Sequence, residues 1–291
     1  MNEPRLRHVQ CLDPRGLHRM AYWQWERDGG ASDRVLVCAH GVSRQGRDFD
    51  ILARAMRDGW RVVCPDVVGR GESDRLADPA GYQLPAYVAD MVTLLARLDA
   101  TTVHWFGTSM GGLIGIAMAA LPGSPISRLV LNDVGPAIDP AGIARIAAYI
   151  GLPLSWASED EAADYLLTIS KGFGPHSREQ WLALTRPMLR RDGDRIRLHY
   201  DPAIGAPLRA MTPEAASAGE AALWAAYDRI RCPTLVLRGA DSDVLAPATA
   251  AAMAARGPKA RVYEFAGVGH APTIVAADQV AVVREFLQAG A

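Results

Sequence analysis

Hydrophobic and polar positions follow two periods along the chain. Short apolar runs rich in β-branched and aromatic residues predict strands, and longer segments with apolar residues at helical spacing predict helices between them. We expect eight strands, the first two as a hairpin, near residues 7–11, 20–27, 34–39, 61–64, 103–106, 128–131, 234–238 and 261–265. Helices are expected at residues 49–57, 85–98, 111–121, 248–256 and 279–287. This order predicts an α/β fold whose eight-stranded, mostly parallel sheet is flanked by helices.

The alternation of strands and helices stops after Asp133. Between residues 135 and 230 no alternation of strands and helices is evident, and amphipathic helices are expected instead, for example at residues 159–171, 178–190 and 220–227. The sheet pattern resumes at Thr234. The sequence therefore predicts a core made of residues 1–134 and 231–291, with residues 135–230 as a helical cap insertion.

Composition narrows the classes of function. The 291 residues suffice for one large α/β domain, and the net charge of −1 gives no electrostatic reason to expect nucleic acid or an anionic membrane as a partner. Four scattered cysteines, without a C-x-x-C pair, indicate neither a metal site nor a disulfide framework. No apolar run has the length of a signal peptide or a membrane helix, so we expect a cytoplasmic protein acting on a small molecule. The oligomeric state is not indicated.

The pentapeptide Gly107-Thr108-Ser109-Met110-Gly111 lies between a predicted strand and a predicted helix. A serine on such a sharp turn projects above the sheet, beside the first free N–H groups of the helix, and the glycines remove side chains that would collide there. This setting favours Ser109 as a nucleophile.

A serine nucleophile needs a base, and the base needs a carboxylate that orients it. Among seven histidines, His270 follows the last predicted strand, so it lies at the same sheet edge as Ser109. The loop after the strand at 234–238 contains two candidate acids, Asp241 and Asp243. The residue types and their positions leave both open.

Attack on a carbonyl also requires donors for the developing oxyanion. The strand at 34–39 ends at His40-Gly41-Val42, where glycine allows the backbone to approach the nucleophile. We expect the N–H groups of Val42 and Met110 to form the oxyanion hole.

These motifs together resemble the α/β-hydrolase superfamily, in its single-domain esterase type with a helical cap. The order nucleophile, acid, histidine is that of the superfamily, and residues 66–73 resemble its D-x-x-G-x-G-x-S turn, whose role is structural. In this family the acid commonly precedes a proline by about four residues, which favours Asp243 before Pro247 over Asp241.

The resemblance implies a cofactor-independent serine hydrolase that cleaves carboxylic esters through an acyl-enzyme, without a metal. A lactonase, a thioesterase, a C–C bond hydrolase and a perhydrolase with the same triad are alternatives, as is a ligand-binding receptor that has kept the fold. Haloalkane dehalogenases and epoxide hydrolases are disfavoured, because they carry aspartate where this chain has Ser109.

In the family, the insertion folds as a lid over the nucleophile, so it is expected to determine which ester fits. We expect most of its large residues to form its own core and a few to line an apolar pocket; these residues are Trp156, Tyr165, Phe173, Trp181, Met188, Tyr200, Met211 and Trp224. Arg44 and Arg47 flank the loop that begins at His40-Gly41-Val42, which we call the oxyanion loop. We favour surface pairing with Asp48 or Asp50 over contact with a polar substrate group.

Overall fold

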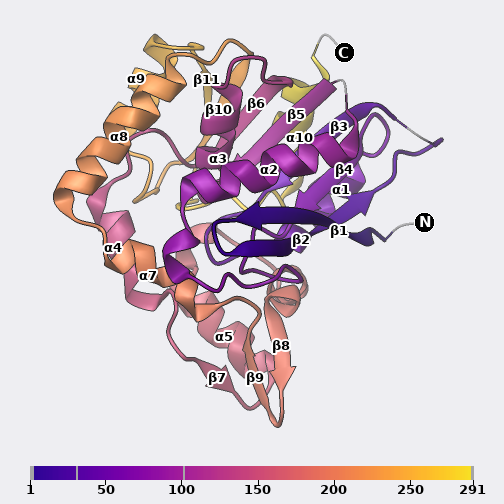
Figure 1. Cartoon of the computed structure of the whole chain (residues 1–291), viewed down its shortest axis with the longest axis vertical. Helices are drawn as coiled ribbons and strands as arrows, with labels where there is room; N and C mark the ends of the chain where they lie inside the picture. Colours follow the sequence, from indigo (N-terminus) through magenta and orange to yellow (C-terminus); the bar gives the residue numbers. More distant parts are fainter. Residues whose placement is uncertain (1–2, 31, 101, 290–291) are drawn as a thin grey trace.

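The computed structural model describes residues 3–30, 32–100 and 102–289. One eight-stranded sheet runs through the molecule in the order β1-β2-β4-β3-β5-β6-β10-β11 (Figure 1). Its strands are β1 (Arg5–Asp13), β2 (Gly16–Trp25), β3 (Arg34–Ala39), β4 (Arg61–Pro65), β5 (Thr102–Thr108), β6 (Ile126–Asn132), β10 (Thr234–Gly239) and β11 (Arg261–Phe265). All eight correspond to predicted strands, so the expected fold class is confirmed.

The two ends of the sheet are built differently. The hairpin strands β1 and β2 pair antiparallel, and β2 also pairs antiparallel with β4. Every other pairing in the sheet, from β4 through β3, β5, β6 and β10 to β11, is parallel. The carboxyl ends of the parallel strands therefore meet at one edge, where side chains from distant parts of the sequence can converge.

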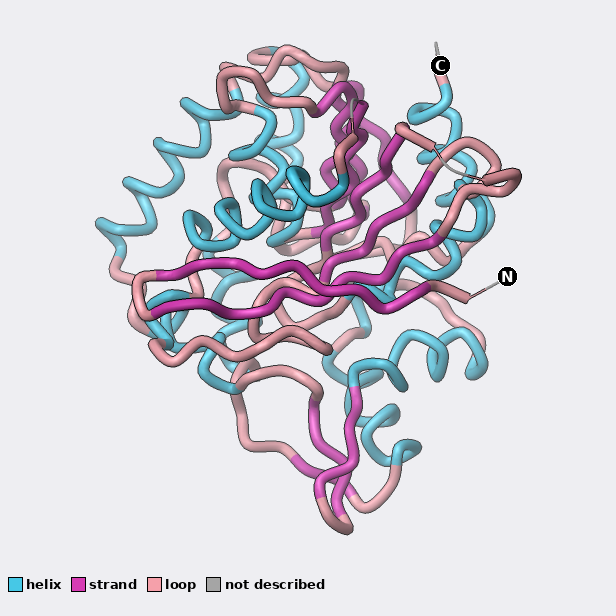
Figure 2. The backbone as a smooth tube through the Cα atoms, turned by 45° about the vertical axis from the view of Figure 1, so that its right-hand side comes forward, coloured by secondary structure: helices cyan, strands magenta, loops and turns pink. Residues whose placement is uncertain are grey.

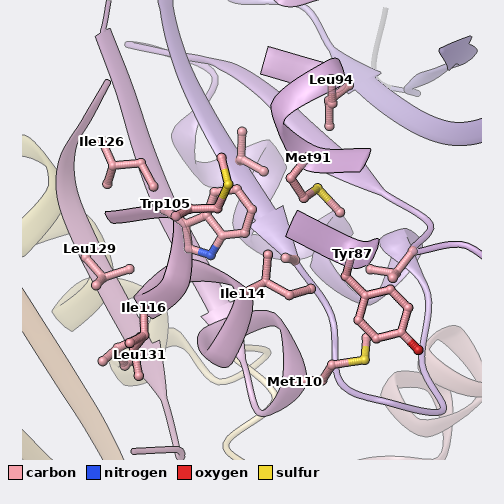
Figure 3. Packing of buried hydrophobic residues seen from close by; sticks show 14 of the residues in the cluster. Tyr87, Met91, Leu94, Trp105, Met110, Ile114, Ile116, Ile126, Leu129 and Leu131 are labelled. Carbon is pink, nitrogen blue, oxygen red and sulfur yellow. The ribbon is translucent and has the colours of Figure 1, made fainter. Parts of the chain in front are cut away.

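Helices cover both faces of the sheet and create two hydrophobic cores. Successive strand residues point to opposite faces, and Trp105 and Phe106 of β5 accordingly belong to different cores. The Trp105 core packs against α2 (Leu84–Leu98), α3 (Met110–Ala119) and α9 (Pro247–Ala255), as Figure 3 shows for α2 and α3. The Phe106 core packs against α1 (Asp50–Met56) and α10 (Ala277–Gln288). This double cover explains why the central strands read as continuous apolar runs.

Residues 135–230, the inserted segment, leave the sheet after β6 and return at β10. The segment extends to the end of the molecule farthest from the eight-stranded sheet (Figure 2). Its helices are α4 (Pro140–Tyr149), α5 (Glu159–Ile169), α6 (Arg178–Thr185), α7 (Ala206–Arg209) and α8 (Pro213–Tyr227). Within the described chain, no helix is both long enough and apolar enough to span a membrane.

The inserted segment is not made of helices alone. A separate three-stranded antiparallel sheet lies in the inserted segment, formed by β7 (Ser155–Trp156), β9 (Arg195–Leu198) and β8 (Leu189–Asp192). The helix expected over residues 178–190 ends at Thr185 and the chain continues into β8. The two-residue loop of this hairpin is Gly193-Asp194, with Gly193 at a φ of +62°, and a Gly-Asp pair is one of the dipeptides that favour such loops.

Candidate active site

Ser109 lies on the turn between β5 and α3, in a backbone conformation that few residues adopt. Its φ is +51° and its ψ is −117°. A Cβ atom on Gly111 would lie 2.0 Å from the carbonyl oxygen of Ala39, and one on Gly107 would lie 2.2 Å from the carbonyl oxygen of Gly111. Only glycine fits at either position, so the close packing of β3, β5 and α3 holds the serine in this strained turn.

His270 comes from the loop after β11 and faces the serine. Its Nε2 atom lies 3.0 Å from Ser109 Oγ. The neighbouring residue Gly269 donates its N–H to the carbonyl oxygen of Gly172 in the inserted segment, at 2.6 Å. The structure thus brings together the two residues that the sequence placed at one sheet edge, and the inserted segment contacts the loop that carries the histidine.

The carboxylate beside His270 is Asp133, the residue directly after β6. Its Oδ2 atom lies 2.8 Å from His270 Nδ1 and also accepts a hydrogen bond from Ser242 Oγ at 2.6 Å, while Oδ1 accepts the N–H of Gly239 at 2.9 Å. Asp133 is completely buried. Because a carboxylate only accepts, His270 carries its proton on Nδ1 and leaves Nε2 free to accept the proton of Ser109.

The prediction that Asp243 orients His270 is contradicted by this geometry. The Asp243 carboxylate is bound by Arg145 of α4, with Nε to Oδ2 at 2.5 Å and Nη2 to Oδ1 at 2.8 Å. This bidentate pairing lowers the pKa of Asp243. The physical reason is the close packing of α4 on this loop, where a Cβ on Gly142 would lie 2.4 Å from the carbonyl oxygen of Asp243. The alternative acid, Asp241, is exposed.

The signal that could have found Asp133 is its position. An acidic residue directly after a buried apolar strand lies at the carboxyl edge of the sheet, as Ser109 and His270 do. In the sheet, β6 pairs with β5 on one side and β10 on the other. Asp133 therefore lies between the turn that carries Ser109 (the elbow) and the loop that contains Ser242. The sequence pattern alone marks Asp133 only as the point where the alternation of strands and helices stops.

The two expected oxyanion donors belong to residues that line the same cavity as Ser109. Val42 follows β3 in a loop that approaches the serine closely, since a Cβ on Gly41 would lie 3.6 Å from Ser109 Cβ. Met110 is the first residue of α3, and helix N-terminal N–H groups have no acceptor within their helix. Among the described residues, neither N–H donates to another group of the protein.

Two hollows adjoin Ser109. The larger, of about 720 Å³, is lined by core residues and by apolar residues of the inserted segment, among them Ile143, Ile146, Ile204, Leu208 and Met211. The smaller, of about 60 Å³, also borders His270 and is lined by Ser43, Arg145, Tyr149, Phe173 and Met188. The nucleophile therefore lies where a wide apolar space meets a narrow, more polar one.

The large residues of the inserted segment are distributed unevenly. None of its six aromatic residues named above lines the larger cavity in the described structure; aliphatic residues and Met211 do so instead. Trp156 is buried in a cluster formed by the inserted segment itself. Trp181 is buried in a cluster that also contains Val275 of the core, and its indole donates to the carbonyl oxygen of Ala163 at 2.7 Å. Phe173 and Met188 line the smaller cavity.

The arginines beside the oxyanion loop pair as expected. Arg44 bonds Asp48 at 2.6 Å, and Arg47 bonds Asp50 at 2.6 Å. Arg44 is buried rather than on the surface, because it also donates to the carbonyl oxygen of Leu184 at 3.0 Å and so joins the core to the inserted segment.

Comparison with known proteins assigns the family. A family model described as the alpha/beta hydrolase fold matches residues 34–277 of the chain. The chain belongs to the α/β-hydrolase superfamily. It is 53% identical over 287 residues to a 3-hydroxybutyrate-oligomer hydrolase of Cupriavidus necator, an alignment that covers 97% of each chain. The match supports hydrolase activity.

Two solved structures resemble this α/β-hydrolase along nearly its whole length. An α/β hydrolase of Novosphingobium aromaticivorans superposes with a TM-score of 0.86 at 33% identity, covering 99% of both chains. A putative hydrolase of Rickettsia typhi superposes with a TM-score of 0.88 at 25% identity, covering 99% of this chain and 100% of the other.

Buried polar residues of this hydrolase hydrogen-bond to the backbone of the loops that follow β3 and β4. The N–H of Val67 donates to His40 Nε2 at 2.9 Å, so Nδ1 carries the proton and donates to the Gly41 carbonyl oxygen at 2.7 Å. Burial lowers the pKa of His40 to about 3, which keeps the ring neutral. Asp66 accepts from the N–H groups of Gly46 and Glu72, at 2.6 and 3.0 Å, as expected for a structural turn.

One group of potential metal ligands exists among the described residues of this hydrolase. Cys11 and His18 of the β1–β2 hairpin and Asp90 of α2 are all buried and lie within 4.8 Å of one another through their ligand atoms. His18 Nε2 bonds the Asp90 carboxylate at 3.0 and 3.1 Å. The hairpin and helix are therefore joined by a hydrogen-bonded cluster that is separate from Ser109.

Proposed function

We propose that this α/β-hydrolase cleaves carboxylic esters with Ser109, His270 and Asp133 as its catalytic triad. The observation that carries the proposal is the continuous chain of hydrogen bonds from Ser109 Oγ to His270 Nε2, at 3.0 Å, and from His270 Nδ1 to Asp133, at 2.8 Å. This is the arrangement that activates a serine hydroxyl at neutral pH.

In the proposed reaction, His270 Nε2 accepts the proton of Ser109 while Oγ forms a bond to the ester carbonyl carbon. The N–H groups of Val42 and Met110 bind the oxygen that becomes negative, and Asp133 stabilises the imidazolium. The bond to the alcohol oxygen then breaks, and His270 gives that oxygen its proton. Water attacks the acyl-enzyme in the same way, with His270 first taking the water's proton and then returning one to Ser109.

We propose short oligomers of 3-hydroxybutyrate, or of similar hydroxy acids, as substrates. The relative at 53% identity bears the name of a hydrolase of such oligomers. A polyester of this kind presents methyl groups and ester carbonyls, with no charge except at its carboxylate end. The aliphatic lining of the cavity of about 720 Å³ beside Ser109 suits the methyl-bearing chain. The inserted segment would then act as the lid that forms one wall of this cavity.

The proposal is tested with the dimer and trimer of 3-hydroxybutyrate, with p-nitrophenyl butyrate, and with a fluorophosphonate label. Ser109→Ala is expected to lose turnover of all three esters and to lose the label. The matched control is Ser170→Ala, because Ser170 lines the smaller cavity and its side chain caps no helix. Retained turnover in Ser109→Ala would exclude the triad, and turnover of p-nitrophenyl butyrate without any release of 3-hydroxybutyrate would exclude the substrate class.

A further inference from the structure

Arg70 is a buried cation without a carboxylate partner. It lies in the turn between β4 and α2, is 1% exposed, and has no carboxylate within 4.0 Å among the described residues. A buried ion without a counter-ion is costly, and a hydrophobic residue of similar size would fill the space more cheaply. We therefore expect this buried charge to have a function that an apolar side chain could not perform.

The partners of the guanidinium are neutral and belong largely to the site. Nε donates to the carbonyl oxygen of Val42 at 2.9 Å, and Nη1 donates to the carbonyl oxygen of Val68 at 2.7 Å and to Tyr87 Oη at 3.0 Å. Nη2 lies 3.7 Å from Met110 Sδ. Arg70 thus contacts both residues whose N–H groups we propose as oxyanion donors.

These contacts restrain the oxyanion loop. A hydrogen bond to the Val42 carbonyl limits rotation about the backbone of that residue, and its N–H direction is set by the same backbone. The fork of the guanidinium reaches Val42 and Met110 from one planar group, which a lysine ammonium on a flexible stem cannot reproduce. Tyr87 and Met110 both belong to the buried cluster on this face of the sheet (Figure 3), so the fork is anchored in packed structure.

The side chains around the Arg70 guanidinium leave its positive charge unneutralised. The faces of the Tyr87 and Tyr82 rings lie 5.1 and 5.7 Å from the guanidinium carbon, and aromatic faces attract a cation without neutralising it. In a buried site, with little water to screen it, a positive charge beside the oxyanion hole favours a developing negative charge. The charge of Arg70 also acts, after burial, to lower the pKa of neighbouring His40, which indicates that its field reaches this loop.

We infer that Arg70 is a positioning residue that holds the oxyanion loop and supplies positive charge behind the oxyanion hole. The inference rests on the proposed acyl transfer at Ser109. Arg70 touches neither the substrate nor the reacting atoms, so its removal is expected to cost less than removal of a direct donor, which typically costs about 10²- to 10³-fold in kcat.

The test compares Arg70→Met, Arg70→Lys and a control, Arg238→Met, on p-nitrophenyl butyrate. Arg238 is also buried, but it bonds Glu264 and the carbonyl oxygen of Leu245. Arg70→Met is expected to lower kcat by about 10- to 100-fold with KM changed less than about 3-fold. Arg70→Lys is expected to recover part of the loss because it keeps the charge. Arg238→Met is expected to retain kcat within about 3-fold.

A second measurement separates this role from a merely structural one. Butylboronic acid forms a negatively charged tetrahedral adduct on a serine oxygen, so its affinity is expected to fall in Arg70→Met by about the same factor as kcat. Unchanged kcat, or lowered kcat with unchanged affinity for the boronic acid, would overturn the inference. If Arg70→Met does not fold, the same comparison on Arg70→Lys decides, since loss of the fork alone is expected to weaken both quantities together. The proposed function fails separately, through activity of Ser109→Ala.

Discussion

Asparagine at position 133 is the sharpest test of the proposed triad. Gly239 N–H donates to Oδ1 of Asp133, so the asparagine must keep its oxygen on that side and place its amide nitrogen toward Ser242 and His270. The amide then donates to His270 Nδ1, where the carboxylate accepted. The imidazole is forced to carry its proton on Nε2, and it can no longer accept the proton of Ser109.

The size of the effect follows from this reversal. Loss of the correct tautomer in a serine triad lowers kcat about 10⁴-fold, which corresponds to about 5.4 kcal/mol of transition-state stabilisation. Asp243→Asn is the matched control. The Asp243 side chain is 39% exposed and bonds Arg145 rather than His270, so we expect its kcat to change by less than about 10-fold.

Steady-state hydrolysis of p-nitrophenyl butyrate at pH 7 measures both variants, and urea unfolding verifies that each is folded. The fluorophosphonate labelling rate gives a second measure, since it reports the reactivity of Ser109 without turnover. Full activity in Asp133→Asn together with a loss of about 10³-fold or more in Asp243→Asn would refute the assignment made from the hydrogen bonds.

Three further predictions concern the elbow, the loop after β10 and the oxyanion loop. Gly111→Ala is expected to unfold the protein or abolish activity, because its methyl would lie 2.0 Å from a carbonyl oxygen, whereas Gly219→Ala, with no atom within 4 Å on α8, should raise the unfolding free energy in urea by about 1 kcal/mol. Ser242→Ala removes one donor to the triad carboxylate, and we expect kcat/KM to fall about 10-fold with the fold intact. His40 has a folded-state pKa of about 3, below its ordinary 6.5, so its contribution to stability is complete above pH 6.5 and is lost as the pH falls toward 3. Between pH 6.5 and 5 this residue alone should therefore lower the unfolding free energy by about 2 kcal/mol, and a pKa near 6.5 for the His40 ring in an NMR titration would contradict its neutrality.

The fold was predictable because periodicity and strand chemistry agree over most of the chain. Each of the eight sheet strands is a buried or alternating run bounded by polar residues, and the elbow was recognisable from the glycines on both sides of Ser109. The inserted segment was less predictable, since its short strands pair locally and carry many arginines, as in β8 and β9. The Gly193-Asp194 loop was the available signal for that hairpin.

The acid could not be chosen from the sequence because two neighbouring strand ends supply carboxylates to the same place. Strands β6 and β10 are adjacent and parallel, so residues after either one reach toward His270. The choice depends on burial: an orienting carboxylate must be held by donors out of bulk water, and Asp133 accepts three hydrogen bonds while completely buried. Asp243 is held by Arg145 of α4 and its side chain is 39% exposed, so it is turned away from His270 and is not shielded from water.

The loop after β10 nonetheless contributes to the site, in a different role. Gly239, the last residue of β10, donates to one oxygen of Asp133 and Ser242 in the loop donates to the other, so the segment predicted to carry the acid instead holds it in place. The chain order of nucleophile, acid and histidine is unchanged by this shift of one strand, since Asp133 still lies between Ser109 and His270. The order of the three residues is therefore consistent with an acid after β6 and equally with one after β10. The hydrogen-bond donors around each carboxylate, which no motif encodes, decide between them.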